Sequence, residues 1–140
     1  VTAAYLLHYA PDLQSLQSMC ARVGQQLRPG GRLICINENP EQTVADYAGY
    51  TQYGFNKSVK EPRVESSPIT YALVSGRSII RFDAYYYSRA TYDSALFAAG
   101  FSQVAWQPLQ LSPDAVAECG ADYWNEYLNN QPVVGLECQL

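Results

Sequence analysis

Residues 27–36 read LRPGGRLICI and contain a helix end, a glycine turn and a buried strand. Pro29 cannot continue a helix, and Gly30 and Gly31 can adopt the positive φ values that end one. The apolar run over residues 32–36 is typical of a strand covered on both faces, as in a parallel sheet. This stretch therefore predicts that a helix ends at the turn and returns the chain to a sheet.

The residues before this turn supply the first half of a crossover unit. Residues 1–7, VTAAYLL, form an apolar run typical of a buried parallel strand. Pro11 and Asp12 favour the first turn of a helix, because proline is tolerated there and an acid complements the helix dipole. An apolar stripe follows at spacings of three and four residues, made of Leu13, Leu16, Cys20, Val23 and Leu27. Strand, helix, glycine turn and strand predict the right-handed crossover of a parallel sheet.

The later elements are less regular. In residues 40–58, Tyr47, Tyr50 and Tyr53 recur every third residue, but two glycines interrupt them, which predicts a short helix and then a loop. The other expected elements are a hairpin of residues 69–74 and 78–86, a helix from Ser88 to about Ala99, a strand within residues 101–111, a short helix from Ser112, a helical turn or two around residues 123–128, and a closing strand over residues 133–140.

Composition and charge restrict the binding partners and the cellular location that we expect for this chain. The net charge is −4 and the basic residues form no cluster, so we expect no nucleic-acid partner. No apolar run approaches the roughly 20 residues that cross a bilayer, so we expect no membrane span. Four scattered cysteines and the single His8 predict no structural metal site. Reduced cysteines in an acidic chain favour a cytoplasmic location.

The crossover also indicates where a ligand would bind. Ligands of open α/β sheets bind outside the carboxyl ends of the strands. His8 follows the first strand and Glu38 follows the second, so both are expected at one crevice. His8 is either a general base, because its ordinary pKa lies near neutrality, or a packing residue bonded to backbone. Glu38 either accepts a hydrogen bond from a ligand hydroxyl or amine, or caps the turn.

Three motifs give the chain a family resemblance. Residues 3–9, the helix, and residues 27–33 resemble the fourth strand, the next helix and the fifth strand of class I S-adenosylmethionine-dependent methyltransferases. The L-x-P-G-G turn at residues 27–31 and the A-G-F turn at residues 99–101 are similar to turns before strands five and six of that family. A hairpin after strand five is common in members that methylate small molecules. The resemblance covers nearly all 140 residues in order.

The resemblance implies a partial Rossmann-like α/β fold, with strands four to seven, an inserted hairpin and an antiparallel edge. It implies methyl transfer from S-adenosylmethionine to a small-molecule acceptor. The cofactor's methionine end would lie near Tyr5, Leu6 and Leu7, and His8 is the candidate catalytic residue. The acceptor pocket is expected in the hairpin and in the tyrosine-rich segments 47–53, 85–87 and 123–127, and the candidate acceptor-binding residues are Glu38, Tyr50, Tyr53 and Tyr86. Chemistry of this kind needs mainly proximity, which agrees with the absence of a G-x-S-x-G, Walker or G-x-G-x-x-G motif.

The family's glycine-rich cofactor turn and its ribose-binding acid would precede this segment. A natural protein seldom opens on a buried strand, so we expect residues 1–140 to be a single partial domain, the C-terminal part of a methyltransferase domain. Alone it should be inactive, and its exposed first strand should favour a homodimer. Two alternatives remain open: a non-catalytic interaction module derived from a methyltransferase, and another nucleotide-binding α/β enzyme.

Overall fold

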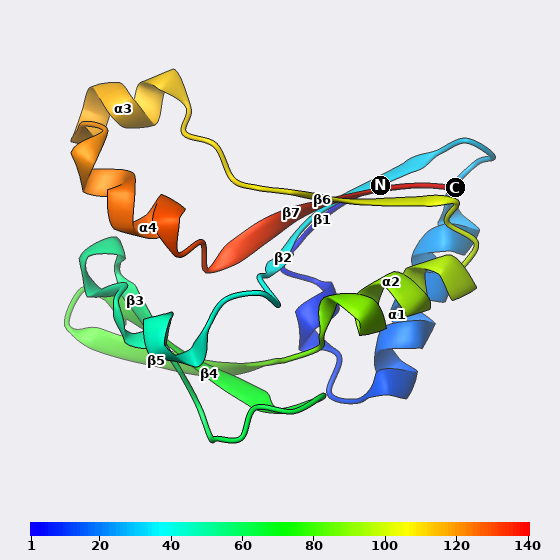
Figure 1. Ribbon diagram of the computed structural model, residues 1–140, viewed down its shortest axis with the longest axis horizontal. Helices are drawn as coiled ribbons and strands as arrows, with labels where there is room; N and C mark the ends of the chain where they lie inside the picture. The colour runs from blue at the N-terminus through cyan, green and yellow to red at the C-terminus, as the bar shows by residue number, and fades with distance from the viewer.

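Two β-sheets lie next to each other in the computed structural model, which describes residues 1–140 (Figure 1). The larger sheet has four strands in the order β1 (Thr2–Ala4), β2 (Arg32–Glu38), β7 (Val133–Gln139) and β6 (Gln103–Gln107). The smaller sheet has three antiparallel strands, β3 (Phe55–Val59), β4 (Pro68–Ser75) and β5 (Ser78–Tyr85). The α/β class expected from the sequence is confirmed.

The predicted crossover unit is present. β1 pairs in parallel with β2, and helix α1 (Leu13–Gln26) connects them. The Asp12 side chain caps α1 by accepting a hydrogen bond from the Ser15 N–H at 2.7 Å. Gly30 has a φ of 74°, which a residue with a side chain adopts only with strain, so the glycine turn releases the chain into β2.

The first strand is shorter than the sequence predicts. Residues 1–7 were expected to be extended, but β1 ends at Ala4 because Tyr5 has a φ of 56°. A one-turn helix, η1 (Leu7–Tyr9), follows directly. The chain therefore leaves the sheet in a tight turn at its carboxyl end.

The antiparallel strand lies inside the larger sheet and not at its edge. β7 pairs antiparallel with β2 on one side and with β6 on the other. The expected antiparallel edge is present, because the edge strand β6 pairs antiparallel with β7, although the strand that reverses direction is β7. Gly135 helps to place β7 there, because a Cβ at this position would lie 3.0 Å from the Gln107 carbonyl oxygen of β6.

Two helices cover one face of the larger sheet (Figure 1). Helix α2 (Arg89–Ala98) packs beside α1, capped by Ser88 as expected and ended by Gly100, whose φ is 97°. The core under the two helices is built mainly from Leu7, Leu16, Cys20, Leu33, Cys35, Tyr92, Leu96, Leu136 and Cys138. The expected burial of Cys20 and Cys35 is confirmed.

The other face of the larger sheet is open. Ile34 and Ile36 alternate with the buried residues of β2, and their side chains are 51% and 38% exposed. Two β-branched apolar residues in the middle of a sheet normally lie under a covering layer. This exposed face is the opposite side of the sheet from the one that α1 and α2 cover.

The smaller sheet contains the predicted hairpin and one strand more. β4 and β5 join at Gly76, whose φ is 61°. The residues before them form two short 3-10 helices, η2 (Val44–Ala48) and η3 (Thr51–Tyr53), in place of the predicted helix. β3 then occupies residues that the sequence assigned to a loop. Its central residue is a lysine, so its sequence carries little apolar alternation.

The remaining helices are α3 (Pro113–Cys119), η4 (Asp122–Trp124) and α4 (Asn125–Asn129), which connect β6 to β7 and lie near β3, at the end of the molecule away from α1 and α2 (Figure 1). They agree with the predicted short helices in this region. None of the helices is both long enough and apolar enough to cross a membrane.

Candidate functional site

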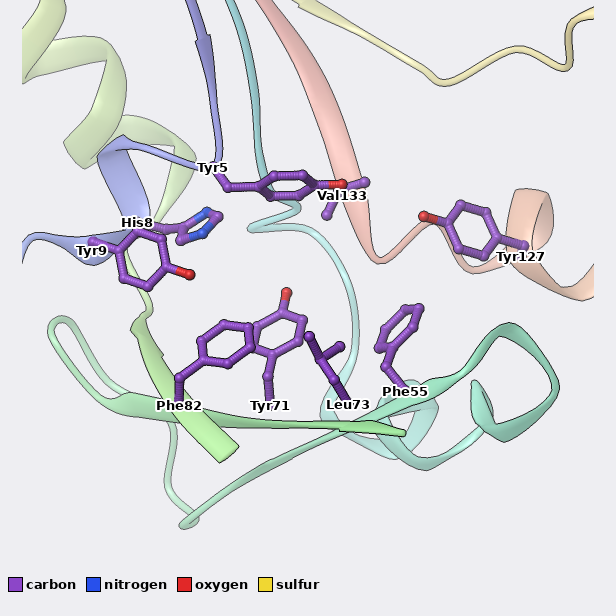
Figure 2. Close-up of a pocket in the computed structure, with 9 residues that line it drawn as sticks. All are labelled: Tyr5, His8, Tyr9, Phe55, Tyr71, Leu73, Phe82, Tyr127 and Val133. Carbon is purple, nitrogen blue, oxygen red and sulfur yellow. The ribbon is translucent and has the colours of Figure 1, made fainter. Parts of the chain in front are cut away.

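A cavity of about 290 Å³ lies between the two sheets, at the carboxyl end of β1. Three groups of side chains line it (Figure 2). They are Tyr5, His8 and Tyr9 from the segment after β1, Phe55, Tyr71, Leu73 and Phe82 from the smaller sheet, and Tyr127 and Val133 from the end of the chain. The crevice that the strand-end rule predicts is therefore present, and its wall is mostly aromatic.

The tight turn after β1 places two neighbouring residues on opposite sides. The Tyr5 N–H donates to the Ile36 carbonyl at 2.8 Å, which keeps the turn attached to β2. Within η1, the Leu7 side chain enters the main core while the His8 side chain reaches the cavity. The positive φ of Tyr5 thus begins the turn that brings the His8 side chain to the cavity.

His8 is a buried, neutral imidazole. The Glu38 N–H donates to its Nδ1 at 3.1 Å, so Nδ1 carries no hydrogen and the ring hydrogen is on Nε2. Burial lowers the pKa of His8 to about 4, with Asn37 opposing this shift and Lys57 adding to it. Nε2 has no hydrogen-bond partner in the chain, and the ring lies on the cavity wall (Figure 2).

This state limits what His8 can do. The ring can donate a hydrogen bond from Nε2, but its one lone pair is already engaged by the Glu38 N–H. A general-base role needs that lone pair. The catalytic role of His8 stays a prediction, and the geometry favours a donor.

Glu38 forms a buried ion pair behind the cavity. Lys57 Nζ lies 2.6 Å from Glu38 Oε1, and the side chains are 0% and 2% exposed. The Tyr71 hydroxyl donates to the other carboxylate oxygen. Burial lowers the pKa of Lys57, which the nearby carboxylate opposes. Glu38 therefore has no free oxygen to offer a ligand, and it orients Tyr71 and the His8 ring instead.

The network continues away from the cavity. Lys57 also donates to the Gln42 side chain and to the Pro132 carbonyl, so all three ammonium hydrogens are used. The Gln42 amide donates to the Tyr50 hydroxyl, and the Tyr50 hydroxyl donates to the Asn130 carbonyl. These bonds connect the smaller sheet to the chain that enters β7.

Tyr50 and Tyr53 lie behind the cavity and not on its wall. Tyr50 stacks on Phe55 with ring centroids 5.0 Å apart, and Phe55 lines the cavity. Tyr53 packs edge-on against Tyr127, another lining residue, at 5.0 Å. Both tyrosines therefore support residues that can touch a ligand.

Of the other predicted site residues, some lie at the cavity and some do not. Tyr5 lines the cavity and is 46% exposed, and the neighbouring Leu6 is 40% exposed at the same rim. The Leu7 side chain is fully buried in the core, so only its backbone can meet a ligand. Tyr86 lies against Arg63, whose guanidinium is 4.1 Å from the ring centroid, and it does not line the cavity.

The sequence indicated two segments of the cavity wall, the hairpin and residues 123–127, but not which of their residues line it. Tyr71, Leu73 and Phe82 lie in the hairpin that was predicted, on its inward face. Alternation along residues 69–74 and 78–86 separates the two faces but does not tell which one faces the ligand. The sequence did not indicate that Lys57 is buried, because a single lysine between polar residues is typical of an exposed surface.

Comparison with known proteins gives relatives for both sequence and fold. No family model matches the sequence. N-demethylindolmycin N-methyltransferase from Streptomyces griseus is 27% identical over 111 residues, which are 79% of this chain and 45% of that protein. The S-adenosylmethionine dependent methyltransferase from Mesorhizobium loti has a TM-score of 0.61 at 13% identity, over 99% of this chain and 60% of that one.

A third relative is CalS10, an amino pentose methyltransferase from Micromonospora echinaspora, with a TM-score of 0.51 at 16% identity over 99% of this chain and 58% of that one. Likenesses at such identities establish the fold. The chain spans about half the length of the curated relative and about 60% of the length of these structures.

Proposed function

We propose that this chain, a class I S-adenosylmethionine-dependent methyltransferase by its fold and sequence relationship, forms the acceptor-binding part of an enzyme that methylates a small molecule. The observation that supports this proposal is the aromatic cavity at the carboxyl end of β1. In a sheet of this class the cofactor crevice lies along the same edge. An acceptor in the cavity would therefore lie beside the cofactor.

The rim after β1 fits the methionine end of such a cofactor. Tyr5 and Leu6 are both exposed there, and Tyr5 has a ring face that can attract a sulfonium cation. When bound, S-adenosylmethionine would supply an electrophilic methyl group: the acceptor's lone pair would form the new bond to the methyl carbon, the sulfur would keep the electrons of the broken bond, and the methylated nitrogen would release its proton to water. The chain's own task is to position the acceptor and exclude water.

The relatives' names agree with a small acceptor. One acts on N-demethylindolmycin and another on an amino pentose. A cavity of about 290 Å³ is at the lower end of the range for small-molecule sites. We therefore propose a small-molecule acceptor, methylated at nitrogen as in the first relative's name, and no nucleic-acid substrate.

We also propose that residues 1–140 are a single partial domain, the C-terminal part of a methyltransferase domain. The chain's coverage of its relatives and the open face at Ile34 and Ile36 support this. The free, buried cysteines Cys20, Cys35 and Cys138 support a cytoplasmic location.

A non-catalytic interaction module is a second candidate, favoured by the edge position of β1. Its outward N–H and C=O groups have no strand partner, so a second copy of the chain could pair with them. Sedimentation velocity at several concentrations tests this homodimer. A monomer at the highest concentration would contradict it.

The test of the proposed enzyme is transfer of a labelled methyl group. The intact protein is incubated with labelled S-adenosylmethionine and with N-demethylindolmycin or other small molecules that carry a nitrogen with a free lone pair. We expect label in a small-molecule product. An intact protein that binds the cofactor and labels no small molecule would contradict the proposal.

A further inference from the structure

The cavity wall contains one buried side chain whose hydrogen-bond donor has no partner in the chain. Tyr71, the most deeply buried tyrosine of the wall, already donates its hydroxyl hydrogen to Glu38. His8 is 2% exposed, and its Nε2–H has no partner in the chain. Nε2 is reachable from the cavity, so an acceptor atom of a ligand can take the place of water as its hydrogen-bond partner.

The cavity wall carries no charged side chain. The nearest buried charges, on Lys57 and Glu38, neutralise each other, and their hydrogen-bonding atoms are all engaged. A charged ligand would lose its hydration without gaining a counter-ion. The wall therefore favours a ligand that is uncharged at neutral pH.

The shape of the wall favours an aromatic ligand. The rings of Tyr71 and Phe82 are parallel within 3°, with centroids 5.2 Å apart, and they rise toward the cavity from neighbouring strands (Figure 2). Tyr5, His8 and Tyr9 face them from the segment after β1 (Figure 2). Ring faces and edges on several sides suit offset or edge-to-face contacts with a flat ring system.

We propose that the methyl acceptor is an uncharged aromatic compound, and that the His8 Nε2–H donates a hydrogen bond to one of its nitrogen or oxygen atoms. This inference rests on the proposed function, because it identifies the cavity's ligand with the acceptor. The bonded atom is not the one methylated, since a lone pair that accepts a hydrogen bond is a weaker nucleophile. His8 is thus a binding residue that orients the acceptor.

Three bicyclic probes test the two halves of this inference by calorimetry on the intact protein. Quinoline has a ring nitrogen that accepts a hydrogen bond, naphthalene has the same shape without it, and N-methylquinolinium has a permanent charge. N-methylquinolinium, like naphthalene, has no acceptor atom, so we expect the charge to make it bind at least about tenfold more weakly than naphthalene. Equal or tighter binding of the cation would overturn the uncharged ligand and indicate a cation-binding aromatic cage.

Two variants of His8 test the hydrogen bond. In His8→Asn the amide oxygen can still accept from the Glu38 N–H, but the Nε2 donor is lost. In His8→Gln an amide nitrogen reaches the place of Nε2. We expect His8→Asn to weaken quinoline binding roughly threefold to tenfold, the worth of one neutral hydrogen bond, and to leave naphthalene binding within about twofold.

The same variants show how the inference fails. His8→Gln should regain part of the quinoline affinity, and unchanged naphthalene binding shows that the cavity is intact. A quinoline affinity that His8→Asn leaves unchanged would overturn the role of His8. Failure of the proposed function looks different: the probes bind as expected, but the intact protein transfers no methyl group.

Discussion

Lys57 of β3 and Glu38 of β2 form a buried ion pair that joins the two sheets, with 2.6 Å between Nζ and Oε1. One end of this contact is at the carboxyl end of β2, and the other is in the smaller sheet, which supplies four of the nine residues that line the cavity. Glu38 also bonds to Tyr71 through its side chain and to His8 through its N–H. The pair therefore sets the spacing between the two walls of the cavity.

Removing one partner of this pair should destabilise the protein strongly. Lys57→Met leaves the Glu38 carboxylate buried without a counter-ion, which typically costs about 3–5 kcal/mol of unfolding free energy. Urea denaturation measures the loss. The double variant Lys57→Met/Glu38→Gln should recover much of it, because no charge is then buried.

A second ion pair provides the control. Arg32 and Glu137 lie 3.0 Å apart on the surface, with side chains 62% and 39% exposed. Arg32→Met should cost less than about 1 kcal/mol, since water screens this pair. Equal losses for Arg32→Met and Lys57→Met would contradict the structural role of the buried pair.

The buried His8 should make the protein less stable in mild acid. Its pKa is about 4 in the folded protein and 6.5 in the unfolded chain, so the unfolded chain binds a proton first as the pH falls. The stability contributed by neutral His8 is complete above pH 6.5 and is lost as the pH falls toward 4. The loss over that interval is about 3 kcal/mol.

Denaturant titrations at several pH values measure this loss. Other groups also titrate in that interval, so the comparison is between the native protein and His8→Gln, which cannot take up a proton. The native protein should lose more stability than the variant between pH 6.5 and 4. Parallel stability curves would contradict this account, because they would show that His8 takes up its proton as readily in the folded protein as in the unfolded chain.

The 140-residue chain alone should bind S-adenosylmethionine weakly or not at all. It has no G-x-G-x-x-G turn, and the rim after β1 offers mainly apolar contacts from Tyr5 and Leu6. Calorimetry on the purified chain measures the affinity, with the intact protein as the reference. Equal affinities would show that this rim is sufficient and would remove the need for a separate cofactor-binding half.

The sequence predicts the crossover unit because local residues determine it. Asp12 caps α1, and Gly30 turns the chain toward β2 after the helix has ended, both through contacts within a few residues. The end of β1 is different, because nothing near Tyr5 signals its positive φ. The turn is held by contacts with β2, a strand about thirty residues further along the chain.

The candidate site was predictable by residue at its rim, but only by segment on its opposite wall. The strand-end rule identified His8, and the family resemblance placed Tyr5 at the same rim; both line the cavity. Tyr50 and Tyr53 were chosen for clustering, yet they support the lining residues from behind. Their orientation depends on how the smaller sheet packs, and that packing depends on the buried Lys57.

The central claim is that the aromatic cavity holds the acceptor during methyl transfer. The most direct measurement is the rate of labelled methyl transfer by the intact protein after a charge is placed in the cavity. Phe82→Asp introduces a carboxylate on the wall, and Ile79→Asp makes a matched apolar-to-acid change on the opposite face of the same strand. We predict that Phe82→Asp lowers kcat/KM for the acceptor at least about a hundredfold, while Ile79→Asp stays within about threefold at equal cofactor affinity. Equal activity of the two variants would contradict the claim.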